Sequence, residues 1–277
     1  MNKNSILAII LALAMVLCCA VGVCAAENPV VYMVDNGTTA PINVIVTIEG
    51  NGLSFQSIPV SLGESSVSHK VANALLAPAV SNAGYTFCGT DGNPITASST
   101  YFSTIKKNNV SYGGTGSGYN GWCFRVNGGI PQESAGWGAT IATTTIHNGD
   151  VIAVHIDDPI SESATTRFMR ASVTSATATS VTANVTESHQ YYGTSWDDWI
   201  TTNFSAVRNQ SFTAKIYNNA NLTDPALSTA TVNLLGTVSF SGLNLTSGQT
   251  YYLVVNGNMS TTATTRYSTC ITAFTVE

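Results

Sequence analysis

The chain has 277 residues, with 10 Lys or Arg against 15 Asp or Glu, which gives a formal net charge of −5. A mildly acidic chain with so few cationic side chains does not suit nucleic acid or an anionic membrane surface, so we exclude both as partners. Thr, Ser, Asn, Gly and β-branched residues predominate, and this composition predicts a mostly β protein.

The first 26 residues have the layout of a secretory signal peptide. Lys3 precedes an apolar run from Ile6 to Val23, and small residues follow before the polar Glu27. A retained transmembrane helix is the alternative, because the run is nearly long enough to span a bilayer. No basic flank follows Ala26, which argues against that alternative. We therefore expect a secreted, extracellular or cell-surface protein with no membrane span once residues 1–26 are cleaved.

Residues 27–40 are expected to form an N-terminal extended segment, with residues 41–158 as the first domain. From Ile42 to Ile48 apolar residues recur at every second position, the pattern of a half-buried strand. A second strand is expected at residues 56–62. The next apolar residues have helical spacing, and we expect a helix that begins at Ser65 or Ser66 and is ended by Pro78.

Glycine-rich loops occupy most of residues 84–121, and strands resume at residues 122–126 and 151–156. The positive φ angles of a tight hairpin suit Asn127-Gly128 between them. Strands, one helix and further strands describe a small α+β unit of β-grasp-like arrangement.

Residues 159–167 are polar and patternless, so we interpret them as a linker. Beyond it, residues 168–277 contain only short strand-like apolar segments with no helix between them. Strands at this spacing predict an antiparallel, immunoglobulin-like β-sandwich.

The segment Gly121-Trp122-Cys123-Phe124-Arg125-Val126-Asn127-Gly128, followed by Asn148-Gly149-Asp150, resembles the secreted-domain family related to the C-terminal domain of transcobalamin and intrinsic factor. In the cobalamin carriers this domain lies over one face of the corrinoid, so the resemblance implies a ligand surface of loops and aromatic side chains, with cobalamin as a possible ligand. The candidate ligand-binding residues are Tyr112, Tyr119, Trp122, Phe124, Asn127 and Trp137.

Two considerations weigh on that surface. Trp122 and Phe124 fall on one face of a strand, and the alternative is that both are core residues. The carriers also close the site with a helical domain that this chain lacks, so a corrinoid would be held on one side only, weakly or with a partner's help.

The segment from Val238 to Val255 resembles the end of a fibronectin type III or related immunoglobulin-like domain. In such domains a Tyr hydroxyl ties the corner between two strands to the backbone, and Tyr251 or Tyr252 would take that part. The Trp expected early in such a domain is missing from residues 176–185, so the sandwich is predicted and the specific family is not.

A second contact patch for sugar or protein is expected where aromatic residues gather near His189 amid Gly, Ser and Asp. Its members are Tyr191, Tyr192, Trp196 and Trp199. The alternative is an irregular strand that packs against its own core.

Three cysteines follow the signal peptide. Cys88 and Cys123 lie in the same half of the chain, so we expect a disulfide between them. Cys270 shares a strand face with apolar residues, so a buried thiol is expected, with an intermolecular bridge as the alternative.

Eight Asn-x-Ser/Thr sequons follow the signal peptide and are candidates for N-glycosylation, although chance explains some of them in so Asn- and Thr-rich a chain. They lie at Asn36, Asn109, Asn184, Asn203, Asn209, Asn221, Asn244 and Asn258.

No catalytic constellation stands out. The Gly116–Gly121 stretch satisfies G-x-G-x-x-G but precedes a strand where a dinucleotide site needs a helix, so it is a loop. The four histidines are scattered, and only His147 with Asp150 or His155 with Asp157 comes near a metal-ligating spacing. We predict no catalytic residues and no metal site.

The leading hypothesis is a non-enzymatic binding protein that contacts a corrinoid or other small ligand, or surface proteins and glycans. The alternative is a structural surface protein, such as an adhesin, surface-layer or filament subunit, that self-assembles through β-strand edges. There, residues 30–34 would add as a strand to a neighbouring subunit.

Overall fold

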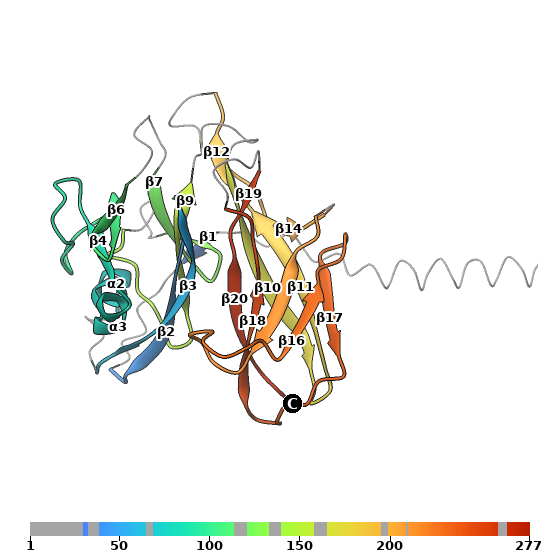
Figure 1. The fold of residues 1–277 in the computed structure, drawn as a ribbon. Helices are drawn as coiled ribbons and strands as arrows, with labels where there is room; N and C mark the ends of the chain where they lie inside the picture. The colour runs from blue at the N-terminus through green and yellow to red at the C-terminus, as the bar shows by residue number, and fades with distance from the viewer. Residues whose placement is uncertain are drawn as a thin grey trace, which may run out of the picture.

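The computed structural model describes residues 30–32, 39–64, 69–113, 121–132, 140–157, 165–194, 199–208, 210–259 and 265–277. Figure 1 shows layers in succession: a small sheet with the helices, a four-stranded sheet, and the two sheets of a sandwich. The fold is mostly β, as predicted. None of the helices within the described residues is long and apolar enough to cross a bilayer. The predicted signal peptide lies outside the described residues.

The first unit is built on a mixed sheet with the order β3-β2-β9-β7. The two central strands, β2 and β9, are parallel, and each pairs antiparallel with its outer neighbour. In this sheet the first and last strands in sequence, β2 and β9, therefore lie side by side with the helices between them in sequence, as in the β-grasp-like arrangement predicted. The strands are β2 (Ile42–Gly50), β3 (Leu53–Leu62), β7 (Gly121–Val126) and β9 (Val151–Asp157).

One face of this sheet carries the first hydrophobic core. Val44, Val46 and Ile48 of β2 point into it because side chains alternate across a strand. Helices α2 (Val71–Leu76) and α3 (Pro78–Asn82) cover this face.

The helix differs from the prediction in both its start and its end. Lys70 is the N-cap and α2 begins at Val71, whereas the predicted caps Ser65 and Ser66 lie outside the described residues. Pro78 does end α2, but the chain resumes as α3 with Pro78 in its first turn. Proline is tolerated there because a first-turn N–H has no intrahelical acceptor to lose.

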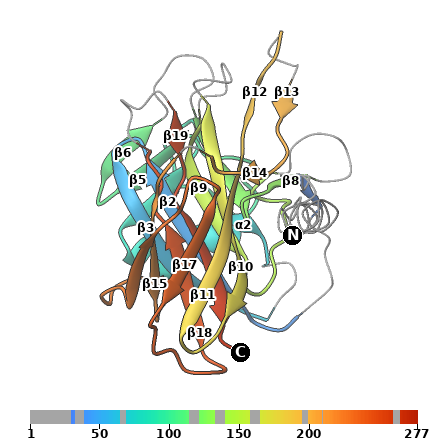
Figure 2. The ribbon, with the colours of Figure 1, turned by 90° about the vertical axis from the view of Figure 1, so that its right-hand side faces the viewer.

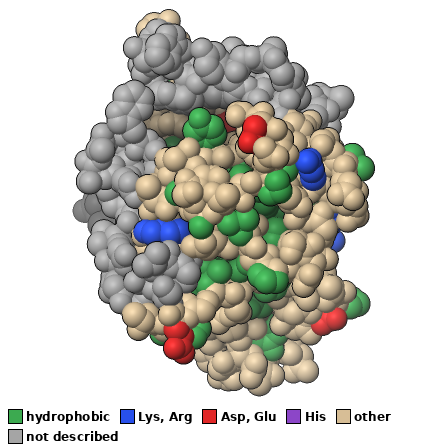
Figure 3. Space-filling model, turned by 90° about the vertical axis from the view of Figure 1, so that its left-hand side faces the viewer, with side chains coloured by type: hydrophobic (Ala, Val, Ile, Leu, Met, Phe, Trp, Pro, Cys, Tyr) green, Lys and Arg blue, Asp and Glu red, His purple; other side chains and the backbone are tan. Residues whose placement is uncertain are grey.

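Two smaller sheets complete the first unit. One is the antiparallel sheet of β4 (Tyr85–Cys88), β5 (Thr104–Lys107) and β6 (Val110–Gly113). In the other, β1 (Val30–Tyr32) pairs in parallel with β8 (Ile130–Gln132). Residues 30–32 of the predicted N-terminal segment thus pair as a strand with β8 of the same chain. Figure 3 shows the outer face of this unit, where isolated charged side chains stand among uncharged ones.

The second unit is an immunoglobulin-like sandwich. One sheet has the order β14-β11-β10-β19 with β17 also paired to β11, and the other has the order β16-β15-β18-β20. The first sheet contains β10 (Thr166–Ala176), β11 (Ser180–Ser188), β14 (Ser205–Ala206), β17 (Thr237–Ser241) and β19 (Arg266–Tyr267). The second contains β15 (Thr213–Tyr217), β16 (Ser228–Thr231), β18 (Thr250–Val255) and β20 (Cys270–Thr275). Strands β12 (Gln190–Tyr192) and β13 (Trp199–Thr201) form a separate ribbon that projects beyond these sheets (Figure 2).

A tyrosine corner closes one end of the sandwich. The Tyr251 hydroxyl accepts a hydrogen bond from the Thr246 N–H at 3.0 Å. Tyr251 is buried and packs in the second core, whereas the neighbouring Tyr252 is half-buried outside that core. Of the two tyrosines named by the sequence pattern, Tyr251 therefore takes the corner position.

The two units share an extensive seam that the sequence did not reveal. The face of the β3-β2-β9-β7 sheet opposite the helices packs against the sandwich, with Ile45, Val254 and Ile271 buried at the centre. Burial of such aliphatic side chains stabilises the contact by roughly 1.5–3 kcal/mol each. Glu49 adds a polar link, since its carboxylate accepts hydrogen bonds from Thr269 N–H at 2.8 Å and Thr269 Oγ1 at 2.9 Å.

The described end of the predicted linker is fixed beside the end of β9. Residues 158–164 lie outside the described residues, but Thr165 and Thr166 are fully buried, and Thr166 opens β10. The Asp157 carboxylate accepts from Thr165 Oγ1 at 3.0 Å and Thr166 N–H at 2.9 Å. The last residues of the polar stretch therefore belong to the sandwich and are fixed to the end of β9.

Candidate functional site

Of the aromatic residues predicted as a ligand surface, the three that the structure describes pack in or against the core of the first unit. Trp122 is 7 % exposed, and its indole N–H donates to the Tyr112 carbonyl at 2.8 Å. Tyr112 and Phe124 are half-buried and pack against the same core. The core interpretation of Trp122 thus holds. Tyr119 and Trp137 lie outside the described residues.

Asn127 serves the fold of the hairpin. It adopts a positive φ of 52°, its amide donates to Asp150 Oδ1 at 2.8 Å, and its Oδ1 accepts from the Val151 N–H at 2.9 Å. Asn127 thereby ties the turn after β7 to the start of β9. It also lines a small seam pocket of about 200 Å³, together with Arg170 and Ile271.

Cys88 and Cys123 are free thiols in this structure, which differs from the predicted disulfide. Cys88 ends β4 in the small sheet, while Cys123 sits in β7 of the central sheet with its Sγ 3.5 Å from the His155 carbonyl. The two cysteines thus belong to different sheets, and the disulfide between them stays a prediction. Cys270 is also a free thiol, and it packs partly buried against the second core.

The predicted aromatic patch lies on the β12–β13 ribbon. Tyr191 stacks on His189 with ring centroids 5.8 Å apart. The backbone register places Tyr192 opposite Trp199, but the structure describes neither side chain, and Trp196 lies outside the described residues. The strand pairing thus brings the backbones of Tyr192 and Trp199 together, and the contact patch itself stays a prediction.

Buried titratable groups gather in the seam. The His155 ring lies 4.3 Å from the Phe168 ring, and the Arg125 guanidinium lies 3.5 Å from the same ring centre. Burial lowers the pKa of His155 well below its usual range, with the Arg125 charge adding to this, and burial lowers the pKa of Arg125 to about 10. No group of three or more His, Cys, Asp or Glu within the described residues is arranged to hold a metal ion.

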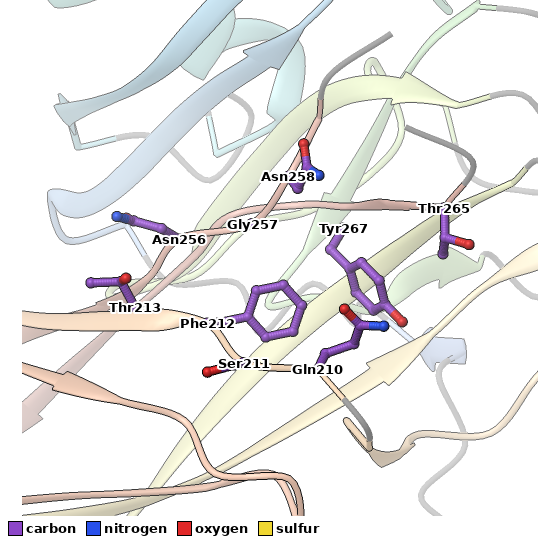
Figure 4. A pocket seen from close by; sticks show the side chains of 9 residues that line it. All are labelled: Gln210, Ser211, Phe212, Thr213, Asn256, Gly257, Asn258, Thr265 and Tyr267. Carbon is purple, nitrogen blue, oxygen red and sulfur yellow. The ribbon is translucent and has the colours of Figure 1, made fainter. Parts of the chain in front are cut away.

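An open pocket of about 460 Å³ lies at the end of the sandwich. Its walls come from the segment that leads into β15 and from the strand end and loop between β18 and β19 (Figure 4). The lining residues are Gln210, Ser211, Phe212, Thr213, Asn256, Gly257, Asn258, Thr265 and Tyr267.

Two aromatic rings form the apolar part of this pocket. Phe212 and Tyr267 lie side by side with ring centroids 5.0 Å apart (Figure 4). Phe212 is 7 % exposed and belongs to the second core, whereas Tyr267 is half-exposed. Burial raises the pKa of Tyr267, so at neutral pH its hydroxyl remains protonated and can donate a hydrogen bond.

Backbone hydrogen bonds fix the pocket wall. Asn258 and Tyr267 exchange a reciprocal pair, N–H to carbonyl, at 2.8 and 3.0 Å, and the Asn256 N–H donates to the Thr213 carbonyl at 2.9 Å. Gly257 between them allows this close approach, because a Cβ there would lie 2.1 Å from the Tyr267 carbonyl oxygen. These hydrogen bonds join the described walls of the pocket to one another.

The chemistry of the lining is neutral. Amide side chains from Gln210, Asn256 and Asn258 provide both donors and acceptors, and hydroxyl groups do the same. Among the described residues, no Lys, Arg, Asp, Glu or His lines the pocket. Such a lining suits an uncharged ligand rich in hydroxyl groups.

Sequence reasoning missed this pocket. Among its residues only Asn258 had been singled out, and then as a glycosylation candidate. Short Asn-, Gln- and Gly-containing turns occur throughout the second half of the chain, so nothing in the local pattern separated these from ordinary surface loops.

No protein-family model, curated protein or solved structure matches this chain. The transcobalamin-like and fibronectin-like relations therefore stay predictions from the sequence.

Proposed function

We propose that this protein is a secreted or cell-surface, non-enzymatic binding protein whose sandwich pocket holds a neutral, hydroxyl-rich ligand such as a segment of a glycan. The observation that carries the proposal is the uncharged lining of amides and hydroxyls beside the half-exposed ring of Tyr267.

Saccharides match this lining in two ways. Their hydroxyl groups both donate and accept hydrogen bonds, as the Gln210, Asn256 and Asn258 amides do. Their apolar C–H faces can pack on an aromatic ring, which Tyr267 presents together with a polar hydroxyl. The pocket of about 460 Å³ falls within the roughly 300–1,000 Å³ common for ligand sites.

The experiment is calorimetric titration of the purified chain, produced in a host that adds no N-glycans, with mannohexaose, maltohexaose, cellohexaose and chitohexaose. We expect at least one to bind, and Gln210→Ala or Asn256→Ala to weaken its affinity about fivefold to tenfold, the loss of one hydrogen bond of about 1 kcal/mol. Asn244→Ala, an exposed amide at the other end of β18, is the matched control and should leave affinity unchanged.

Cobalamin and cobinamide belong in the same titration, because the sequence resemblance proposes a corrinoid. Corrinoid binding that is unchanged by Gln210→Ala and Asn256→Ala would favour a ligand site in the first unit over the sandwich pocket. If none of the hexasaccharides binds at millimolar concentration, or if binding ignores the pocket variants, the glycan proposal fails.

A second function, self-assembly as a surface subunit, is favoured by one observation. Residues 30–32 add as a strand to β8, so this segment has the backbone pairing that strand exchange between copies requires. Electron microscopy of the chain with and without residues 27–40 tests this. Ordered assemblies that disappear on deletion support it, and assemblies that persist unchanged contradict it.

A further inference from the structure

Two glycosylation sequons border the sandwich pocket. Gln210 and Ser211 of the sequon at Asn209 line it, and so does Asn258, the acceptor of the sequon Asn258-Met259-Ser260. Asn209 and Ser260 themselves lie outside the described residues. Asn258 is exposed, as an acceptor asparagine must be to reach a glycosylating enzyme.

The backbone of Asn258 has a fixed place at the mouth of the pocket. Its N–H and carbonyl are both bonded to Tyr267, whose ring forms one wall. Because Asn258 is itself a lining residue, a group attached to its side chain would start at the edge of the pocket. An N-glycan is bulky and hydrated, so it would stand over an open pocket of about 460 Å³.

The other described sequons do not share this position. Asn184 lies in the middle of β11, half-buried and paired with Thr237. Asn244 is exposed between β17 and β18, at the opposite end of β18 from Asn258. Of the sequon asparagines within the described residues, Asn258 is the one that lines the pocket.

We propose that Asn258 is an N-glycosylation site and that its glycan caps the pocket, so that ligand binds the form of the protein that is unmodified at Asn258. The statement about ligand binding rests on the proposed function, whereas the glycosylation of Asn258 and the covering of the pocket do not.

The modification is a group transfer from a lipid-linked oligosaccharide by the export machinery of the cell. The Asn258 side-chain nitrogen forms a bond to the anomeric carbon and loses one proton. The bond from that carbon to the lipid phosphate breaks, and the phosphate leaves with the electron pair. No residue of this chain needs to act as a catalyst.

The test compares the wild-type chain, Ser260→Ala and Asn244→Gln, each secreted from a yeast that N-glycosylates. Ser260→Ala removes the sequon but keeps Asn258, and Asn258→Gln is a second variant that removes the same glycan. Peptide mass spectrometry gives the occupancy of Asn258. The rate of Tyr267 nitration by tetranitromethane, measured on its own peptide, reports access to the pocket without any ligand.

We expect wild type to carry a glycan on Asn258, and Tyr267 nitration to be at least several-fold faster in Ser260→Ala and Asn258→Gln. Asn244→Gln should nitrate at the wild-type rate. An unmodified Asn258 in a chain that is glycosylated at Asn244 or Asn221 would overturn the proposal, as would equal nitration rates with Asn258 fully occupied.

Titration of the same proteins with the four hexasaccharides separates the two proposals. Affinity that appears or rises in Ser260→Ala supports both. If Ser260→Ala binds none of them yet nitrates faster, the glycan-binding function fails and the cap stands. If fully glycosylated wild type binds as tightly as Ser260→Ala, the cap fails and the binding function stands.

Discussion

Burial should make two of the cysteine thiols, those of Cys123 and Cys270, poorly reactive. Burial raises the pKa of Cys270 to about 12 and, together with the Asp157 charge, raises the pKa of Cys123 above its usual range. A thiol that stays protonated is a poor nucleophile. At neutral pH, Ellman's reagent should therefore leave both groups unmodified in the folded protein.

The same reagent tests the disulfide. In concentrated guanidinium, the chain without its signal peptide should titrate as the three free thiols Cys88, Cys123 and Cys270. A single thiol in denaturant would mean that two of them are bridged, and the predicted Cys88–Cys123 pair would then be correct.

His155 makes stability depend on pH. Burial holds the pKa of His155 in the folded chain well below the ordinary value of 6.5. Below pH 6.5 the unfolded chain therefore binds a proton at His155 more readily than the folded chain does. The stability that neutral His155 provides is complete above pH 6.5 and is lost as pH falls toward its folded pKa. The urea midpoint should therefore fall between neutral pH and pH 5.

His155→Phe keeps an aromatic ring beside Phe168 and removes the titration. Glu49 acts in the opposite direction above pH 4.5, because burial raises its pKa despite the hydrogen bonds from Thr269. Glu49 is the same in wild type and in His155→Phe. The difference between the pH profiles of these two proteins therefore gives the contribution of His155. We expect His155→Phe to flatten the decline below pH 6.5, and an unchanged slope would contradict the assignment.

At the scale of the element, the tyrosine corner is the clearest test of the sandwich. Tyr251→Phe leaves the Thr246 N–H without its partner and should lower the free energy of unfolding by about 1–2 kcal/mol without changing the fold. Tyr252→Phe is the matched control and should cost less. Denaturant unfolding measures both, and equal effects would argue against the corner.

Strand patterns in this sequence predicted the elements well, for a physical reason. Alternating residues such as Val44, Val46 and Ile48 must share one face of a strand, and that face became the first core. The helix boundaries were less predictable because Pro78 ends one helix and begins the next. The resemblance to a fibronectin type III domain narrowed the corner position to Tyr251 or Tyr252, and only the structure decided for Tyr251.

The seam was hidden because its residues resemble a solvated face. Thr47, Arg125 and His155 occupy the polar positions of their strands, yet each is at most 3 % exposed. Only a second layer supplied from far along the chain buries them. The sandwich pocket was hidden likewise, because it depends on Phe212 and Tyr267, which are more than forty residues apart in sequence and are brought together only by the fold.

At the scale of the whole molecule, the seam should make the two units unfold together. Ile45, Val254 and Ile271 are buried between them, and the Glu49–Thr269 hydrogen bonds cross the same boundary. Calorimetry of the wild-type chain should show one cooperative transition.

Ile271→Asp places an unpaired charge in the seam and should split that transition or lower its midpoint sharply. Leu235→Asp changes an apolar side chain that is 69 % exposed, and it should have little effect. Two separate transitions in wild type would contradict a shared seam.

The most direct measurement on the pocket is nuclear magnetic resonance of the side-chain amides during titration with the same four hexasaccharides, using Ser260→Ala protein so that Asn258 is unmodified. The account predicts that the signals of Gln210, Asn256 and Asn258 shift together and saturably with at least one of these sugars, while Gln249 at the other end of β18 stays in place. Saturable shifts confined to the first unit, or no shift at millimolar sugar, would contradict it.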